Sequence, residues 1–258
     1  MGEGARARAV KICAGSGLSD KMGAKRMESA MRDQVILVTG GTRGIGRAIA
    51  AEAASAGACV VVTSRRPAGK PTPGPGVTCI ELDVTSEDSV RDAFAGVLKR
   101  HGRLDGLVNN AGVGVFKPIG ELTLAEWERI VATDLTGAFL CCREAFRAME
   151  PAGGGRIVNI GSVADYVPLP GNAAYGSAKA GLRALSAILN EEGKAKGIRV
   201  THVSLGAVHT DIWEERPGFS AADMLPLEEV GRQIAQLLRL PLAVRIDEIK
   251  LLPPKGVL

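Results

Sequence analysis

From residue 34 onward, short apolar runs rich in β-branched residues alternate with longer segments of helical periodicity. Seven runs are expected to form strands: 35–39, 59–64, 77–82, 104–110, 156–162, 198–204 and 247–252. Helical patterns fall near 45–56, 86–100, 124–149, 174–195 and 227–239. Strands that are apolar on both faces and separated by helices form parallel sheets. The alternation therefore predicts an α/β fold with a doubly wound, seven-stranded parallel sheet and helices on both faces.

Residues 33–258 are expected to form a single domain, because 258 residues can still share one hydrophobic core. Residues 1–32 show no sustained period and carry small, basic and polar side chains, which predicts a disordered N-terminal extension. A weaker alternative is an organelle transit peptide that contains arginine. The stretch "RRPAGKPTPGPG", residues 65–76, is too rich in Pro and Gly for a full helix and predicts a loop.

Charge and cysteine content exclude several classes of function. The net charge is only +4 and the basic residues are scattered, so no nucleic-acid partner is expected. No apolar run approaches the roughly 18–20 residues of a membrane-spanning helix, so no membrane partner is expected either. The five cysteines are odd in number and lack metal-binding spacing. This indicates a reduced, cytoplasmic chain with no metal site.

The first strand leads into "TGGTRGIG", residues 39–46, and then into a helix. Glycines in such a turn let backbone N–H groups approach a diphosphate at the helix N-terminus. We therefore expect this turn to bind a dinucleotide, as in a Rossmann fold; the alternative is a tight strand-to-helix connection. The candidate cofactor-binding residues of this turn are Gly40, Thr42, Arg43, Gly44, Ile45 and Gly46.

The end of the second strand, "TSRRP", indicates which dinucleotide is bound. An acidic residue about 20 positions after the glycine turn usually meets a free ribose 2′-hydroxyl, but here Ser64 and Arg65 occupy that neighbourhood. Arg66, Lys70 and Arg43 add positive charge nearby. Guanidinium groups suit a 2′-phosphate, so the sequence predicts NADP(H). The alternative is a solvated basic loop.

Further along the chain, Tyr175 and Lys179 stand four residues apart in "YGSAK", on one face of a predicted helix. Ser162 ends the strand "RIVNIGS". Together with "TGGTRGIG" and "NNAG" (109–112), these motifs resemble the short-chain dehydrogenase/reductase family over residues 34–252. The resemblance implies a single-domain carbonyl reductase or alcohol dehydrogenase that acts on a small molecule.

In that family resemblance, Tyr175 is the acid/base, Lys179 favours its phenolate form and holds the nicotinamide ribose, and Ser162 holds the substrate oxygen. Tyr175 and Lys179 could instead be an exposed pair, and Ser162 a cap at the end of the strand. A non-catalytic NADP(H)-binding regulator of the same fold is the alternative function. A regulator needs no such set of Ser, Tyr and Lys, which favours the enzyme.

The resemblance implies further cofactor contacts. Asp83, with Val84 beside it, corresponds to an adenine contact, although Asp83 could also cap the following helix. After the fourth strand the residues implied are Asn109, Ala111 and Gly112, and after the sixth they are Gly206, Val208 and Thr210. Leu205 stands where the family usually has proline.

Residues 209–225 are expected to form a substrate lid, with Trp213 as a pocket wall or as the aromatic anchor of a surface loop. The helices predicted at 124–149 and 174–195 have more apolar surface than one sheet face needs. As in many members of the family, this predicts a homodimer or homotetramer formed through these helices.

A carboxylate interrupts the apolar face of the helix predicted at 124–149. The face is formed by Trp127, Ile130, Val131, Leu135, Ala138 and Cys142, and Asp134 falls on it, where the family usually has Asn. Asp134 is therefore a candidate member of the catalytic set. It could be protonated and donate a hydrogen bond, or ionised and paired with Lys179 directly or through water. A third possibility is that it bonds backbone N–H groups at a helix kink near Gly137.

Overall fold

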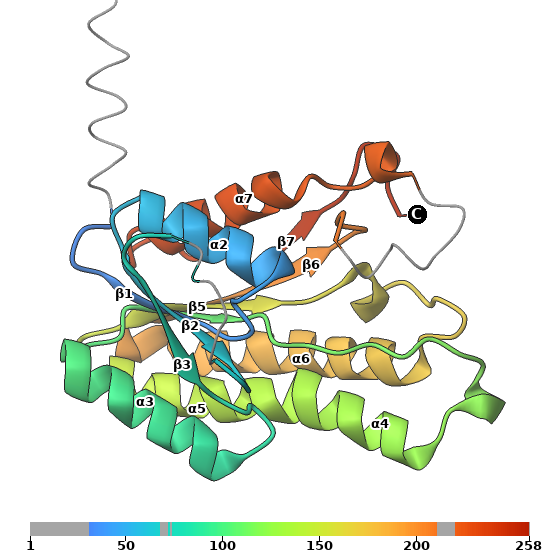
Figure 1. Ribbon diagram of the computed structural model, residues 1–258, viewed down its shortest axis with the longest axis horizontal. Helices are drawn as coiled ribbons and strands as arrows, with labels where there is room; N and C mark the ends of the chain where they lie inside the picture. The colour runs from blue at the N-terminus through green and yellow to red at the C-terminus, as the bar shows by residue number, and fades with distance from the viewer. Residues whose placement is uncertain (1–30, 68–71, 73, 211–219, 258) are drawn as a thin grey trace, which may run out of the picture.

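The computed structural model describes residues 31–67, 72, 74–210 and 220–257. Its centre is a seven-stranded sheet in the order β3-β2-β1-β4-β5-β6-β7, in which every neighbouring pair is parallel (Figure 1). The strands are β1 (Val35–Val38), β2 (Cys59–Ser64), β3 (Val77–Glu81), β4 (Gly106–Asn109), β5 (Gly155–Ile160), β6 (Ile198–Leu205) and β7 (Glu248–Leu251). The predicted doubly wound sheet is thus confirmed.

Helices cover both faces of this sheet. The helices are α2 (Gly44–Ser55), α3 (Glu87–His101), α4 (Leu124–Val131), α5 (Gly137–Met149), α6 (Ala173–Glu192) and α7 (Leu227–Arg239). Helices α2 and α7 lie on one face, and α3, α5 and α6 lie on the other (Figure 1). No helix is described between β2 and β3, where the abundance of Pro and Gly predicts a loop.

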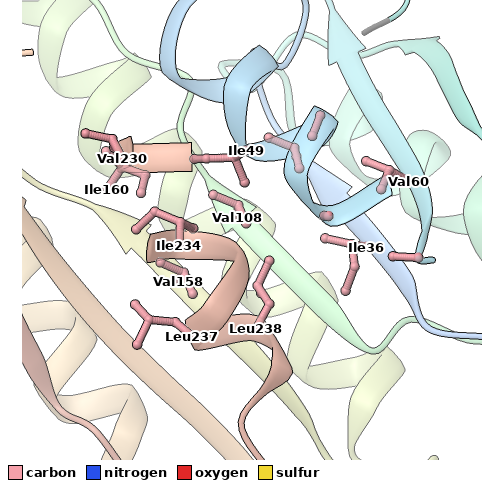
Figure 2. Close-up of a cluster of buried hydrophobic side chains, with 14 of the residues drawn as sticks. Ile36, Ile49, Val60, Val108, Val158, Ile160, Val230, Ile234, Leu237 and Leu238 are labelled. Atoms are coloured by element: carbon pink, nitrogen blue, oxygen red, sulfur yellow. The ribbon is translucent and has the colours of Figure 1, made fainter. Parts of the chain in front are cut away.

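Two apolar cores hold these layers together. The first packs the sheet against α2 and α7, with Ile36, Val108 and Val158 meeting Ile49 and Ile234 (Figure 2). The second packs the opposite face against α3 and α5. Nearly all sheet residues of β1, β4 and β5 are buried on both sides, which explains the continuous apolar runs in the sequence.

The helix predicted at 124–149 is interrupted. A π-helical turn, Ala132–Thr136, separates α4 from α5. A π turn holds more residues than an α turn, so side chains before it are rotated relative to those after it. Trp127, expected on the core face, is 36% exposed, although Ile130 on the same helix is fully buried. Asp134, inside the π turn, is 1% exposed.

At the start of the described chain, Met31 is fully buried and its backbone N–H bonds to Ala56. The core therefore includes a residue two positions before the predicted domain boundary at 33. The predicted extension otherwise lies outside the described residues. Within the described part of the chain, no helix is long and apolar enough to cross a membrane.

Candidate active site

The sequence-predicted site residues come together at one edge of the sheet, because the carboxyl ends of parallel strands share an edge. The order of the strands reverses between β1 and β4, the position where such sheets bind ligands. The turn after β1 contributes Gly40 to Gly46, and the ends of β2 to β6 contribute most of the others. Asp134 comes from the π turn, and Tyr175 and Lys179 come from α6.

The turn between β1 and α2 excludes side chains at three positions. Gly40 has a φ of 64°, and a Cβ there would lie 3.1 Å from Ala111 Cα. A Cβ on Gly46 would lie 2.7 Å from the Gly40 carbonyl oxygen. Gly44 has a φ of 50°, and the nearest atom to a Cβ there would be Thr210 Cγ2 at 4.0 Å. Gly40 and Gly46 therefore pack tightly against neighbouring backbone. Gly44 has free space beside it and requires glycine only because its φ is positive.

The first turn of α2 provides backbone donors at this opening. Its N-cap, Arg43, is extended and makes no side-chain cap hydrogen bond. Backbone N–H groups at a helix N-terminus without a capping side chain attract phosphate. This arrangement fits a dinucleotide diphosphate, which the residues Thr42, Arg43, Gly44 and Ile45 would hold.

In the "NNAG" segment, the side chain of Asn109 points away from the glycine turn. Asn109, expected to face the cofactor, is 5% exposed, and its amide donates to Asn159 Oδ1 at 2.8 Å beneath α5. Neighbouring strand residues point to opposite faces, so Asn110 faces the glycine turn instead. Its amide donates to the carbonyls of Thr39 (2.9 Å) and Gly40 (3.2 Å).

Thr39 and Asn110 together join the ends of β1 and β4, and neither is among the residues predicted from the sequence to form the site. Thr39 Oγ1 accepts the N–H groups of Asn110 and Ala111, both at 3.0 Å. The only feature of the sequence that points to this role is the position of Thr39 as the first residue of "TGGTRGIG". These bonds fix the glycine turn to the strand that leads into Gly112.

At the end of β2, Ser64 is half-buried while Arg65 and Arg66 are exposed. Ser64 Oγ bonds the backbone of Arg66, which forms a small turn. Within the part of the chain that the structure describes, Arg43 and Arg65 form no ion pair with a carboxylate, so their charge is uncompensated there. Lys70 lies outside the described residues.

Asp83 does not cap the following helix. Ser86 does so, by accepting the N–H of Ser89. Asp83 instead accepts the N–H and the hydroxyl of Thr85, at 3.0 and 2.7 Å. Val84 is buried, and a Cβ on Gly137 would lie 2.9 Å from it, so the helix after the π turn packs directly on this loop.

Ser162, Tyr175 and Lys179 lie at the end of β5 and the start of α6. Ser162 begins the short 3₁₀ helix η3 (Val163–Asp165), and its Oγ accepts the Ala164 N–H at 3.3 Å. Lys179 Nζ lies 5.5 Å from the centroid of the Tyr175 ring and donates to the Ile160 carbonyl at 3.0 Å. Phe116 contacts the Tyr175 ring from the loop after β4, with 5.5 Å between ring centroids.

Asp134 pairs directly with Lys179. Its Oδ2 lies 3.2 Å from Lys179 Nζ, and both side chains are almost fully buried. Its Oδ1 accepts the N–H of Val113 at 2.8 Å. Of the three possibilities considered for Asp134, the structure has the ion pair, and the backbone N–H it accepts comes from the loop after β4 rather than from the helix. Gly112 leaves room for the pair, since a Cβ there would lie 2.8 Å from Oδ2.

This pairing sets the charge of the lysine. Burial lowers the pKa of Lys179, but the negative charge of Asp134, with smaller contributions from Tyr175 and Asp165, outweighs it and raises the net pKa above the ordinary value. The ammonium therefore stays protonated at neutral pH.

Backbone contacts join the two ends of the segment that follows β6. Val208 forms a parallel bridge with Leu225, and hydrogen bonds join Leu225 N–H to Ala207 O and His209 N–H to Leu225 O. Val208 is buried in the core, while Gly206 and Thr210 are half-buried. Trp213 and most of the predicted lid lie outside the described residues.

Comparison with known proteins agrees with this geometry. The family described as short chain dehydrogenase matches residues 34–219. The chain belongs to the short-chain dehydrogenase/reductase family.

Members of the short-chain dehydrogenase/reductase family that resemble this chain have different names. A 3β-hydroxysteroid dehydrogenase of Mediterraneibacter gnavus is 35% identical over 74% of this chain and 71% of its own length. A 3-oxoacyl-acyl-carrier-protein reductase of Aquifex aeolicus is 36% identical over 72% of this chain and 78% of its own. The structure of a short-chain type dehydrogenase/reductase from Mycobacterium ulcerans has a TM-score of 0.78 at 28% identity, covering 86% of this chain and 89% of that one.

Proposed function

We propose that this protein is an NADP(H)-dependent oxidoreductase that interconverts a ketone or aldehyde with an alcohol, using Tyr175 as acid/base. Membership of the family makes it an oxidoreductase that acts on hydroxyl or carbonyl groups with a nicotinamide cofactor. The observation that carries the proposal is the position of Lys179. This lysine is buried and charged, 5.5 Å from the Tyr175 ring centroid, and it donates to the carbonyl of Ile160 at the end of β5.

The chain's own residues would divide the work as follows. A nicotinamide supplies the hydride when it is bound. The Ser162 hydroxyl already accepts the Ala164 N–H, so its hydrogen can be donated to the substrate oxygen. Tyr175 gives its phenolic proton to that oxygen in reduction and regains it in oxidation, while Lys179 stabilises the phenolate between these steps.

The preference for NADP(H) is supported by the exposed guanidinium groups at the ends of β1 and β2. Arg43 and Arg65 stand where a 2′-phosphate would lie in this fold, and no acidic residue occupies the end of β2. A guanidinium forms paired hydrogen bonds with phosphate oxygens. Because cellular NADPH pools are kept reduced, we expect reduction to be the direction of the reaction in the cell.

The substrate is expected to carry an apolar group next to its carbonyl. Tyr175 belongs to a small apolar cluster with Val113, Val115 and Leu135, and Phe116 packs on its ring. The relatives named above act on steroid or acyl substrates according to their names. Those names differ, so they do not select a substrate for this chain.

We also propose that the protein works in the cytoplasm as a homodimer or homotetramer. Phe139 on α5 and Ile188 on α6 are 42% and 57% exposed, on the same side of the sheet (Figure 1). They lie on the two helices through which copies of the chain are expected, from the sequence, to associate. Cys141 and Cys142 are buried thiols, which favours a reducing compartment.

The alternative function is a regulator of the same fold that binds NADP(H) without chemistry. Such a protein would have no use for a charged lysine buried beside a tyrosine. NADPH oxidation against a panel of aldehydes, ketones, 3-oxo esters and quinones separates the two. Turnover of at least one compound is expected in the wild type, while Tyr175→Phe should fold, bind NADPH and lose nearly all turnover. Near-normal turnover by Tyr175→Phe would show that Tyr175 is not the acid/base. Tighter binding of NADH than of NADPH would contradict the proposed preference for NADP(H).

A further inference from the structure

Three polar side chains lie buried behind Ser162, and the mechanism described above does not use them apart from the small contribution of Asp165 to the pKa of Lys179. They are Asp165, the last residue of η3, and His202 and Ser204 on β6, which are 5%, 1% and 0% exposed. Asp165 Oδ2 lies 2.6 Å from His202 Nε2 and accepts the Ser204 hydroxyl at 2.7 Å. Two donors thus converge on one carboxylate oxygen in the interior of the protein.

The neighbouring backbone is fitted to this cluster. A Cβ on Gly161 would overlap the His202 imidazole and lie 2.8 Å from Asp165 Oδ2. Burying a carboxylate is costly unless donors surround it. His202 and Ser204 contact Oδ2 of Asp165, whereas Asp165 Oδ1 and His202 Nδ1 have no hydrogen-bond partner among the described residues.

The same carboxylate reaches the catalytic serine. Asp165 Oδ2 faces the Ser162 backbone N–H at 3.4 Å and closes a capping box, in which Ser162 Oγ accepts the Ala164 N–H. That contact occupies a lone pair of the hydroxyl and directs its hydrogen away from the turn. Because Asp165 is also bonded to β6, the turn cannot rotate without breaking two buried hydrogen bonds.

We propose that Asp165, held by His202 and Ser204, is a positioning residue that fixes the Ser162 hydroxyl as the donor to the substrate oxygen. This inference rests on the proposed function for its effect on turnover. It adds a connection from β6 to the turn after β5.

A double-mutant cycle tests whether Asp165 acts through Ser162. Asp165→Ala is expected to lower kcat about 10- to 100-fold, less than the 10²- to 10³-fold typical of losing a direct donor to the reacting oxygen. In the Ser162→Ala background the same change should cost less than about twofold, because the group it positions is already gone. Equal losses in the two backgrounds would overturn the proposal.

Asp165→Asn provides the conservative rescue. One amide oxygen can replace Oδ2 and accept both donors, so this variant should retain at least about a third of kcat. Thr201→Val is the matched structural control, because Thr201 is buried on the same strand and donates to Ile246 O at 2.7 Å, away from Ser162. It should lower the melting temperature without lowering kcat. If Asp165→Ala behaves as Thr201→Val does, Asp165 is only structural and the proposal fails.

Amide hydrogen exchange gives a readout that needs no substrate. Exchange at Ala164 should be faster in Asp165→Ala than in the wild type and unchanged in Thr201→Val. Should Asp165→Ala not fold, Ser204→Ala removes one donor and should show the same pattern at smaller amplitude. Unchanged exchange at Ala164 would overturn the positioning role. A wild type with no turnover on any carbonyl would instead overturn the proposed function, and the exchange measurement would still decide the role of Asp165.

Discussion

The Asp134 carboxylate holds the Lys179 ammonium at 3.2 Å with one oxygen and the Val113 N–H at 2.8 Å with the other. One buried side chain therefore joins the π turn, α6 and the loop after β4. The positive charge of the lysine beside Tyr175 is therefore balanced by a carboxylate, which affects both the rate of the reaction and the stability of the fold.

Replacing Asp134 with Asn should keep or raise activity and move the pH–rate profile for alcohol oxidation to lower pH. The amide oxygen can still accept the Val113 N–H, while the negative charge next to Lys179 is lost. The positive field of the lysine then acts on Tyr175 without compensation and favours its phenolate. Initial rates across the pH range, at saturating cofactor, measure the shift. An inactive Asn variant would show that the carboxylate itself is needed.

Removing the other partner should be severe. Lys179→Met leaves the Asp134 carboxylate buried without its cation, which is expected to lower the free energy of unfolding by about 3–5 kcal/mol. The double variant Asp134→Asn, Lys179→Met removes both charges and should recover most of this loss. Urea unfolding of the four proteins measures the cycle, and a double variant as unstable as Lys179→Met would contradict it.

The stability that the Asp134–Lys179 pair contributes depends on pH in a direction that follows from the pKa of Lys179. The pKa of Lys179 is raised in the folded protein, since the attraction of Asp134 and its neighbours outweighs the effect of burial. The stability that the pair contributes is therefore complete below the ordinary lysine pKa of about 10.4 and is lost as the pH rises through the folded value. The difference between wild type and the double variant should stay constant near neutral pH and decrease as the solution becomes alkaline.

Gly112→Ala should disturb the pair by steric contact. The added methyl group would lie 2.8 Å from Asp134 Oδ2 and 3.6 Å from Lys179 Nζ, so the expected cost is about 1–3 kcal/mol together with a lower kcat. Gly96→Ala is the control, because Gly96 lies within α3 and a Cβ there meets nothing within 4 Å. It should be stabilising by about 0.5–1 kcal/mol. Thermal unfolding distinguishes the two, and equal effects would argue against a tight contact at Gly112.

Arg65→Asp should invert the cofactor preference. It removes a guanidinium from the end of β2 and supplies an acceptor for a ribose 2′-hydroxyl, so the Kd for NADPH should rise and that for NADH should fall, each by about tenfold or more. Arg129→Asp makes the same charge change on α4 and should leave both constants alone. Fluorescence titration with the two cofactors measures them. If both variants weakened NADPH binding equally, the effect would come from the net charge of the protein rather than from the position of Arg65.

The sheet was predictable because its strands are buried on both faces and therefore read as unbroken apolar runs. The glycine turn, Ser162, Tyr175 and Lys179 were predictable because each lies within a short local motif. The ion pair of Asp134 with Lys179 could be named as one possibility, since periodicity placed Asp134 on the buried face.

Other features depend on geometry that a pattern of period 3.6 does not contain. The π turn divides the helix predicted at 124–149, and nothing in the apolar spacing marks it. The side chains of Asn109 and Asn110 lie on opposite faces of the sheet, and the sequence motif alone does not show which of them points toward the glycine turn. Asp165 and His202 are 37 positions apart, and only the parallel register of β5 and β6 brings them together.

The bridge between Val208 and Leu225 matters for protein engineering. The bridge holds residues 208 and 225 of the chain side by side. A segment of different length or sequence, taken from another member of the family, could be spliced between them while the sheet and the candidate catalytic residues keep their positions. Such exchanges would test the expectation that residues 209–225 form a substrate lid, because a lid would change the substrate range when one continuous stretch of chain is replaced.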